Sequence, residues 1–552
     1  MSGRMQAAVF LVIALFSLFV GLGARDLWNP VEPRYAGISA EIARTGNWLV
    51  PHYDGKFYDQ KPAPFFWVGA LLLRGVRGEE LRRFLVRLPS ALGGLLMALA
   101  TWALGRRLFG KGAGFWAATL LATSWLVFWS SHFCHMDTLA AAALSGAILG
   151  FLILKDEIDP ARRRRGFLLA ALSVSGGLLL KGPATMVFAA VFLFVCAAWE
   201  RDAGWLKRTR PLAVCAVALA VGAAWFVPAA LEAGGAWARS LAIDRGVFHL
   251  VDPENPDKHG PLYYVSVLWG VAAPWIFLLP PAWWAARRSP PSSPARQAWT
   301  LCTAWILSVL VVLHLGTTFR SRYLLPLFPP VFVLVGAYVH GSASRKAHQA
   351  WGERVLWAGA AVVLVAGALG VTWGRFPWQG NVDAVMTDLP SSRFLFSVPV
   401  FVLGVAGAAS VLQGRGGPWG RLAIVLGLAL TMTTWSEMVA PAMDRLRGYD
   451  RLVAEVQRHL TEGRRLLAVS SYHTKESTAG YWNFHVGVEP EPVDLDGKML
   501  ERLASREPLM VLVRAKDTRD HPRCVPRSFR SLCTGVGRRR LCLFLNPWPP
   551  PY

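Results

Sequence analysis

Residues 28–36 of this chain read Trp-Asn-Pro-Val-Glu-Pro-Arg-Tyr-Ala, and residues 58–62 read Tyr-Asp-Gln-Lys-Pro. Both stretches lie between apolar segments long enough to cross a membrane. A carboxylate, an arginine, a lysine and several aromatic side chains therefore crowd one loop beside lipid, where an unpaired charge is costly. Such charges need partners, water or a charged substrate, so this loop is a candidate functional segment.

The composition of the whole chain predicts a membrane protein. Of its 552 residues, 54% are hydrophobic and only 17% are charged, and the mean hydropathy is +0.36. A soluble protein carries charge on about a quarter of its residues. The 25 tryptophans fit a protein with two broad membrane interfaces. We therefore expect a mainly α-helical, polytopic membrane protein.

The net charge of +23 would by itself favour nucleic-acid binding. The lysines and arginines lie mostly in short loops between apolar segments, where positive charge fixes the orientation of a membrane protein. This placement argues against nucleic acid as a partner. It favours membrane lipids and phosphorylated lipids instead.

The apolar segments predict about thirteen membrane spans. The fifth and sixth are separated at Pro183, because proline breaks a helix interior. The predicted spans are 6–23, 84–105, 113–131, 137–154, 167–180, 184–199, 211–228, 262–284, 298–316, 322–340, 354–373, 394–412 and 421–438.

The loop charges predict the orientation of these spans. Basic pairs and runs such as Arg106-Arg107, Arg162 to Arg165 and Lys207-Arg208 fall on one side, which is the cytoplasmic side by the positive-inside rule. The C-terminal region and the first loop are then external. The start of the chain could instead be a signal peptide, but its apolar run is longer than a usual signal core, so we expect an uncleaved first span.

The first external loop, residues 24–83, is expected to lie partly along the membrane surface. Pro64–Leu73 is too short to span, and arginines follow it at once. Residues 38–44 form a second short segment of this kind, which also ends in an arginine. This pattern is typical of interfacial helices and predicts a membrane-parallel platform.

The composition changes near residue 440. Residues 450–460 predict an amphipathic helix, and the short apolar runs 466–470, 509–513 and 541–545 predict strands. We expect a transmembrane domain over residues 1–439 and a small periplasmic α/β domain over residues 440–552. One disulfide could close among its three cysteines, Cys524, Cys533 and Cys542. Spacing slightly favours Cys524–Cys533, but the sequence leaves the connectivity open.

Nine charged or polar residues beside the apolar segments fall on the outer face once this topology is assigned. Any one of them is equally well explained as a helix-end side chain that reaches the headgroups. As a set they predict a cavity at the outer leaflet, in which carboxylates act as a base or metal ligands and cations bind phosphate. The set is Glu32, Arg34, Lys61, Asp137, Lys181, Arg245, Arg320, Arg322 and Tyr323.

The order and spacing of these motifs resemble those of the GT-C polyprenyl-phosphate-sugar glycosyltransferases. That family includes the protein O-mannosyltransferases and the bacterial aminoarabinose transferases to lipid A, and the resemblance covers nearly the whole chain. Residues 31–36 match the family's Asp-Glu-x-x-Tyr, 60–62 its Glu-Lys-Pro and 181–183 its Lys-Gly-Pro. Residues 259–275 resemble its His-x-x-Pro…Tyr-Tyr…Pro-Trp segment, and 320–326 its (Lys/Arg)-x-x-Tyr-x-Leu-Pro motif.

Two positions depart from the family pattern. Val31 stands where the family has its first acid, and Gln60 stands where it has a glutamate associated with a metal ion in the aminoarabinose transferases. An amide is a weaker ligand than a carboxylate for a hard cation. A divalent metal site, if one forms, would draw on Glu32, Asp59 and Asp137, and we expect metal dependence to be weak or absent.

The resemblance also implies roles for single residues. Lys61, Arg245 and Tyr323 match positions that hold the polyprenyl phosphate, and Arg320 and Arg322 add positive charge beside them. Glu32, Asp137 and Arg34 are the catalytic candidates, with Glu32 or Asp137 orienting or deprotonating the acceptor.

The reaction that the resemblance implies transfers a sugar from undecaprenyl phosphate to lipid A or a related glycolipid, with inversion at the anomeric carbon. The resemblance places this reaction at the periplasmic face of a bacterial inner membrane. A protein O-mannosyltransferase-like enzyme is an alternative, although a Ser/Thr acceptor needs a firm base. A pseudo-enzyme that binds polyprenyl phosphate without turnover is a second alternative. A lipid transporter is a third, and it would predict inverted repeats and helices broken near the membrane midplane.

Overall fold

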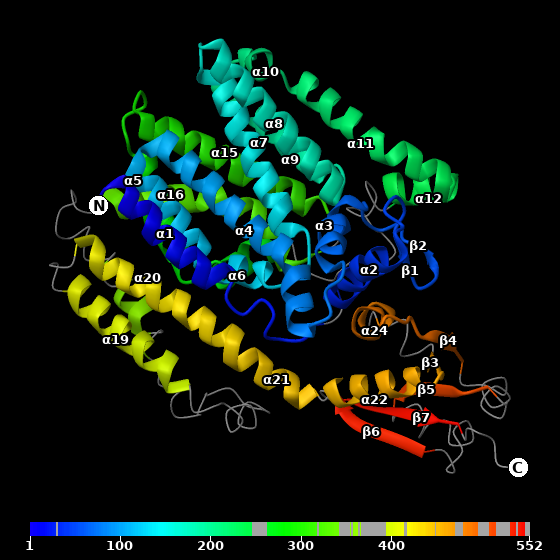
Figure 1. Ribbon diagram of the computed structural model, residues 1–552. Coiled ribbons are helices and arrows are strands. Elements are labelled where there is room, and N and C mark those ends of the chain that lie inside the picture. Colours follow the sequence, from blue (N-terminus) through cyan, green and yellow to red (C-terminus); the bar gives the residue numbers. More distant parts are fainter. Residues whose placement is uncertain are drawn as a thin grey trace, which may run out of the picture.

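A computed structural model gives the arrangement of most of the chain (Figure 1). It describes residues 1–28, 31–244, 262–316, 319–341, 354, 357–362, 365, 393–412, 417–447, 449–469, 478–494, 507–514, 530–536 and 539–546.

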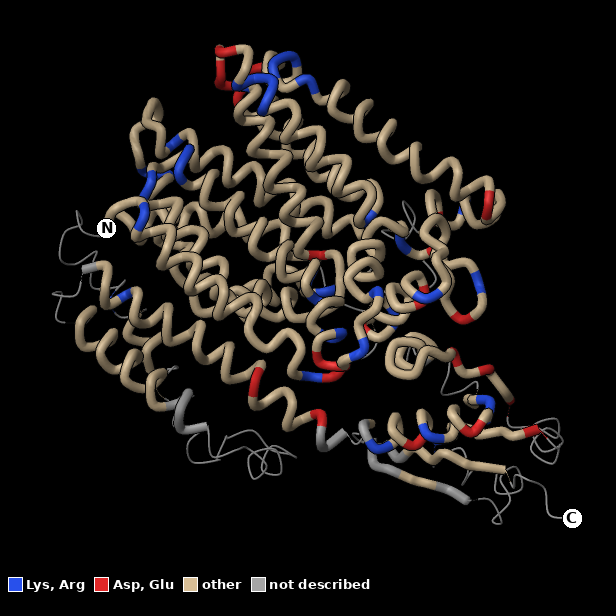
Figure 2. Tube along the Cα trace, in the orientation of Figure 1, with Lys and Arg blue, Asp and Glu red and all other residues tan. Residues whose placement is uncertain are grey.

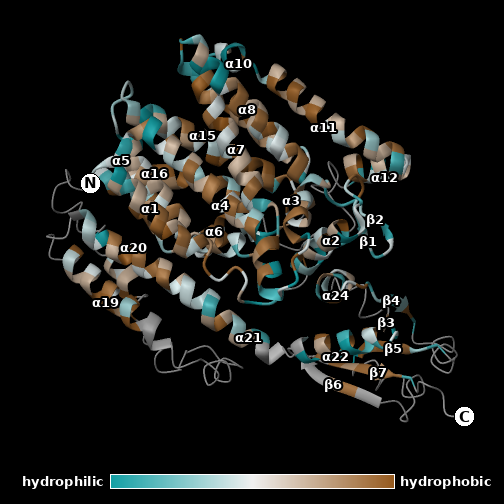
Figure 3. Cartoon of the chain, in the orientation of Figure 1, coloured by the Kyte–Doolittle hydropathy of each residue, from teal (hydrophilic) through white to brown (hydrophobic). Residues whose placement is uncertain are grey.

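Apolar helices form the main body of the described chain, and Figure 3 shows hydrophobic residues along most of their length. Six of them are long and apolar enough to cross a membrane, and two bent helix pairs raise the number to as many as eight. The six spans are Glu79–Phe109 (α4), Asp137–Asp156 (α7), Pro211–Ala233 (α11), Pro294–His314 (α15), Ser321–His340 (η4 and α16) and Pro418–Asp444.

The bent pairs and the shorter apolar helices complete the bundle. The first pair, Lys111–Ala122 (α5) and Trp125–Ser131 (α6), bends by 62°. The second, Tyr263–Val271 (α13) and Trp275–Arg287 (η3 and α14), bends by 108°. The shorter helices are Gly3–Leu18 (α1), Pro64–Leu73 (α3), Ala184–Glu200 (α9) and Val398–Val411 within Arg393–Leu412 (α19). The chain is therefore polytopic. The number thirteen stays a prediction, and most of the predicted span 354–373 lies outside the described residues.

The expected break before Pro183 is present. Pro160–Lys181 (α8) begins after Asp159, whose side chain caps the Arg162 amide, and ends at Gly182 with a φ of +79°. The next helix, α9, begins at Ala184. Small residues let α7 and α8 approach closely, since a Cβ on Gly150 would lie 2.6 Å from the Ala170 nitrogen. This packing fixes Lys181 near the start of α7.

The first loop folds into helices and a short hairpin at one end of the bundle (Figure 1). Val31–Thr45 (α2) is followed by the paired strands His52–Tyr53 (β1) and Lys56–Phe57 (β2), and then by α3. α2 contacts both α3 and Thr478–Val486 (α24). The helices meet at glycines, because a Cβ on Gly37 would lie 2.4 Å from the Gly480 Cα.

The helix that begins at Gly417 crosses the expected domain boundary without a break in the described chain. Gly417–Thr434 (α20) continues through the π-helical turn Trp435–Val439 (η6) into Ala440–Arg447 (α21). Tyr449–Thr461 (α22) then leads into a five-stranded sheet. The remaining short helices are Gly204–Thr209 (α10), Gly235–Arg239 (α12) and the π-helical turn Ser240–Asp244 (η1).

The strands of this sheet are Arg465–Val469 (β3), Glu491–Val493 (β4), Leu509–Arg514 (β5), Arg530–Val536 (β6) and Arg539–Leu545 (β7). The sheet is mixed, with strand order β4-β3-β5-β7-β6. β3 pairs in parallel with β4 and β5, and β7 pairs antiparallel with β5 and β6. The helix and the three strands expected from the sequence are α22, β3, β5 and β7.

The disulfide joins Cys533 to Cys542, so the expectation that favoured Cys524–Cys533 is wrong. The two cysteines lie directly opposite each other on the antiparallel strands β6 and β7. Sequence spacing could not show this, because it does not give the register of a hairpin. Cys524 lies outside the described residues.

Candidate active site

A buried ion cluster is centred on Glu32, in the first turn of α2. One of its carboxylate oxygens accepts from Arg25 Nη1 at 2.7 Å, and the other accepts from Arg87 Nε at 2.7 Å. The backbone N–H groups of Trp28 and Cys134 donate to the same carboxylate at 2.9 and 3.0 Å. Burial alone would raise the pKa of Glu32, but Arg25 and Arg87 lower it to about 2. Glu32 is therefore a charged anchor.

The two arginines of this cluster tie several segments together. Arg87, on α4, donates to the backbone carbonyls of Leu22, Arg25 and Asp26. Arg25 donates to the carbonyl of His132, just after α6. Neither arginine side chain is exposed by more than 5%. The cluster thus fixes the start of the first loop, α4 and the α6–α7 connection in one arrangement.

A second cluster is centred on Asp137, the first residue of α7. Lys181, the last residue of α8, binds its Oδ1, and the Arg322 guanidinium Nε lies 3.1 Å from its Oδ2. His135 Nδ1 lies 3.4 Å from the same Oδ2. The Lys181 ammonium also lies 4.5 Å from the centre of the Tyr323 ring. Two cations and a phenol ring from two separate helices, α8 and η4, therefore meet at one buried carboxylate of a third helix, α7.

The first loop reaches this second cluster through Tyr35. Burial raises the pKa of Tyr35 well above its usual value, and Tyr58, Arg322, Asp137 and Arg34 all act electrostatically on the same group. Arg34 Nη1 in turn donates to the Gln60 side chain at 2.7 Å. The Arg34–Gln60 pair thus belongs to the same neighbourhood as Asp137. Figure 2 shows blue and red segments gathered at the end of the bundle where the first loop lies.

The other predicted site residues are placed differently. Lys61 follows Gln60 and is half-buried. Asp59 accepts a hydrogen bond from Ser240 at 2.5 Å. Arg320 is exposed, and its guanidinium donates to the neighbouring Phe319 carbonyl. Arg245 lies outside the described residues.

The carboxylates proposed as metal ligands do not come together. Glu32 is held by two arginines, Asp59 by Ser240 and Asp137 by Lys181 and Arg322. Within the described ranges no group of three or more His, Cys, Asp or Glu side chains could hold a metal ion. The donor set of these three residues does not fit a divalent cation.

A third polar contact joins the first loop to the C-terminal elements. The Asp444 carboxylate accepts from the Asp26 backbone N–H and the Trp28 indole, both at 2.6 Å. His485, on α24, bridges Asp26 at 3.0 Å and Glu79 at 3.1 Å. Burial alone would lower the pKa of His485, but Asp26 and Glu79 raise it to about 9. This end of the bundle is therefore closed by residues from both ends of the chain.

Comparison with known proteins connects this architecture to a family. Residues 60–227 match the family model of the dolichyl-phosphate-mannose-protein mannosyltransferases, a stretch that includes Asp137 and Lys181. A relative in Erwinia tasmaniensis, an undecaprenyl phosphate-alpha-4-amino-4-deoxy-L-arabinose arabinosyl transferase, is 28% identical over 75% of each chain. The enzyme of the same name in Pectobacterium carotovorum is 25% identical over 80% of this chain and 77% of its own.

The fold matches solved structures over almost the full length. The crystal structure of ArnT from Cupriavidus metallidurans bound to undecaprenyl phosphate aligns with a TM-score of 0.79 over 98% of both chains, at 19% identity. The chain therefore has the fold of this ArnT structure. The Archaeoglobus fulgidus oligosaccharyltransferase is more distant, with a TM-score of 0.51 at 13% identity over 92% of this chain and 69% of its own.

Several residues of these polar clusters were not among the expected site residues. Arg87 lies inside an apolar segment, and an arginine there is a signal that a buried partner exists. Arg25 directly follows the first apolar run, so its charge also indicates a nearby partner. Asp444 and His485 could not be found in this way, because they lie far along the chain from their partners.

Proposed function

We propose that the chain transfers a sugar from an undecaprenyl-phosphate donor to lipid A or a related glycolipid, at the periplasmic face of the bacterial inner membrane. The observation that carries this proposal is the meeting of Lys181, Arg322 and Tyr323 at Asp137. A lipid-linked sugar phosphate needs such cations at the membrane edge. The relatives named for aminoarabinose transfer support this donor and this sugar.

The proposed reaction requires stabilisation of the negative charge on the leaving phosphate more than removal of a proton from the acceptor. The bond between the anomeric carbon and the donor phosphate oxygen breaks, a bond from that carbon to the acceptor oxygen forms, and the leaving phosphate gains a negative charge. Lys181 and Arg322 would neutralise this charge, and cations placed in advance cost no reorganisation. Arg34 and Lys61, on the first loop, would add to the same field. Attack opposite the leaving phosphate inverts the anomeric carbon.

We assign Asp137 the task of holding its two cations in position. Its carboxylate already accepts from Lys181 and Arg322, so it is poorly placed to take a proton from an acceptor. An acceptor that is itself a phosphate, as in lipid A, is already anionic and needs no strong base. Such an acceptor is compatible with valine at position 31, where the family pattern has an acid.

We assign Glu32 a positioning role instead of a base role. Its carboxylate is fully buried and receives donors from Arg25, Arg87, Trp28 and Cys134. Through the Cys134 amide it fixes the connection that leads to Asp137. An acceptor could not reach this carboxylate without breaking the cluster.

The deciding experiment compares lipid A from cells that carry the chain with lipid A from cells that lack it, by mass spectrometry. A mass increase equal to one aminopentose on a lipid A phosphate, lost when Lys181 is changed to alanine, is the expected result. Unmodified lipid A in both strains, with the protein present in the membrane, would contradict the proposed acceptor.

A protein acceptor is the second candidate. The match of residues 60–227 to a family named for protein mannosyltransfer favours it. It predicts O-linked sugars on periplasmic proteins of cells that carry the chain. The same mass spectrometric comparison, applied to tryptic peptides, separates the two acceptors.

A further inference from the structure

Arginines and tryptophans gather where α14 ends and α15 begins. We call this group the basic patch, and it consists of Arg287, Arg288, Arg296, Trp283, Trp284 and Trp299. The 21-residue helix α15 is long enough to cross the hydrocarbon core, which is about 30 Å thick. Because Arg296 lies in the first turn of α15, the basic patch lies at one edge of the membrane. The candidate active site lies at the other edge, since α7 runs from Asp137 there to Asp156, which lines the same cavity as Arg296.

The arginines of the basic patch contact aromatic rings and a backbone carbonyl. The Arg288 guanidinium lies 4.7 Å from the centre of the Trp284 ring. The Arg296 guanidinium lies 4.6 Å from the centre of the Trp299 ring and donates to the Arg287 carbonyl. Within the part of the chain that the structure describes, none of the three arginines forms an ion pair with a carboxylate. The basic patch therefore has positive charge available to an anion, beside tryptophans of the kind that lie at headgroup level.

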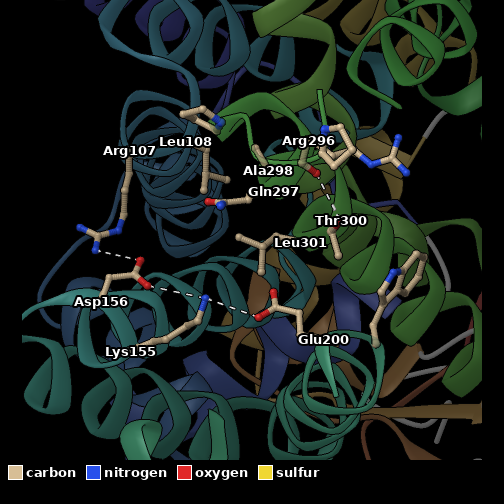
Figure 4. A pocket seen from close by; sticks show the side chains of 13 residues that line it. Arg107, Leu108, Lys155, Asp156, Glu200, Arg296, Gln297, Ala298, Thr300 and Leu301 are labelled. Carbon is tan, nitrogen blue, oxygen red and sulfur yellow. Dashed lines mark hydrogen bonds and ion pairs between the residues drawn. The ribbon is translucent and has the colours of Figure 1, made fainter. Parts of the chain in front are cut away.

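A polar cavity of about 520 Å³ lies beside Arg296 (Figure 4). The carboxylates across this cavity already have cations. Asp156 pairs with Arg107 at 3.2 Å, and the Lys155 ammonium lies between Asp156 and Glu200, at 3.7 and 3.8 Å. Figure 4 shows these four side chains joined in a row of alternating charge. The charged lining residues are Arg107, Lys155, Arg296, Asp156 and Glu200, so the cations outnumber the carboxylates and Arg296 supplies the excess charge.

The side of α15 that carries Arg296 continues into exposed apolar side chains. Leu307 lies about three turns farther along on the same side, because an α-helix has 3.6 residues per turn. The Leu307 side chain is 42% exposed, and Val311, one turn beyond, is 53% exposed. Exposed apolar surface of this kind marks a contact with lipid in a membrane-spanning helix. A soluble anion would contact only the arginines, whereas a phospholipid would contact both the arginines and this apolar surface.

We propose that the basic patch and this side of α15 bind an anionic phospholipid, such as phosphatidylglycerol, at the membrane edge opposite the candidate active site. The phosphate lies against Arg296, since arginine forms strong charge-assisted hydrogen bonds to phosphate. Arg287 and Arg288 add positive charge beside it, as in other basic lipid sites between membrane helices. An acyl chain lies along Leu307 and Val311. A zwitterionic headgroup fits less well, because its ammonium would lie beside the arginines while the carboxylates across the cavity already have cations.

The binding test uses the purified full chain in detergent, stripped of lipid, and measures the midpoint of thermal unfolding. A ligand that binds only the folded protein raises this midpoint. Phosphatidylglycerol should raise it by several degrees more than phosphatidylcholine or phosphatidylethanolamine with the same acyl chains. An equal shift with all three lipids would overturn the proposal. Glycerol 3-phosphate at the same concentration should give little shift, and a shift as large as that of phosphatidylglycerol would overturn the assignment of a lipid.

Variants separate the basic patch from general effects of positive charge. Arg296→Gln should remove the preference for phosphatidylglycerol, and full preference in this variant would overturn the site. The matched control is Arg164→Gln, which removes an exposed arginine near the start of α8, at the same end of the bundle, and should keep the preference. An equal loss in both variants would overturn a specific site. If Arg296→Gln fails to fold, the exposed pair Arg287→Gln and Arg288→Gln is changed together, and full preference there would overturn the proposal.

Discussion

Arg322 and Asp137 meet through a contact of 3.1 Å, with the arginine in a 3₁₀ turn and the aspartate at the first residue of a separate helix. Lys181 binds the other oxygen of the same carboxylate. One carboxylate thus holds two cations from different parts of the chain. The two cations and one carboxylate carry a net positive charge, which a bound phosphate would neutralise.

Replacing Arg322 with glutamine should lower kcat/KM for the lipid-linked donor by about 100-fold, because one charge-stabilising donor is worth that much in comparable sites. Arg322→Lys should recover part of the loss, since it keeps the charge but not the geometry. Steady-state kinetics in detergent measure both variants. Arg77→Gln, at an exposed loop position, is the control. A change of less than threefold in Arg322→Gln would remove this residue from the site.

Glu32→Gln should destabilise the protein by about 3–5 kcal/mol, because it leaves Arg25 and Arg87 buried without their counter-charge. Since the pKa of Glu32 is lowered to about 2, the wild-type cluster is stable above about pH 4.5 and loses its contribution as the pH falls towards 2. Thermal unfolding measures the loss. Unchanged stability with abolished turnover would instead favour the role of a base.

The contact of α24 with the first loop should weaken at alkaline pH. The pKa of His485 is raised to about 9, so its contribution is complete below about pH 6.5 and is lost as the pH rises through 9. Amide hydrogen exchange in α24 should therefore accelerate between pH 8 and 10, after correction for the intrinsic rate. His485→Gln should show the faster exchange already at pH 7. His459→Gln is a fitting control, because the described contacts of that histidine stay within its own region.

Chelation should leave the wild-type activity intact, since the described carboxylates do not assemble into a metal site. Gln60→Glu is expected to form an ion pair with Arg34, which already donates to Gln60, and not to create a metal requirement. Activity with and without chelator measures both proteins. Complete inhibition of wild type that added metal reverses would show this expectation to be wrong.

Reporter fusions test the orientation. A fusion after Ala198, near the end of α9, should report the cytoplasm, and one after Pro441, in α21, should report the periplasm. The opposite result at either position would place the active site on the other face.

The spans and the site were predictable to different degrees. Long apolar runs reveal helices such as α7, because a helix that crosses a membrane needs about 20 predominantly apolar residues. The charges of Asp137, Lys181 and Arg322 could be singled out, because charge is rare beside lipid. Their pairing could not, since the sequence does not tell which helix ends become neighbours. The same limit applies to Glu32: its position suggests a catalyst, whereas the structure surrounds it with arginines from two other segments.

Asp444 binds Asp26 and Trp28, which are made long before it during synthesis. The spans that precede Asp444 can insert into the membrane as they emerge, but this part of the first loop lacks its partner until α21 has been made. Assembly of the site therefore ends after translation of the last helices, not in the order in which its residues are read. A chain truncated before Asp444 would enter the membrane with an unfinished loop, open to quality-control proteases.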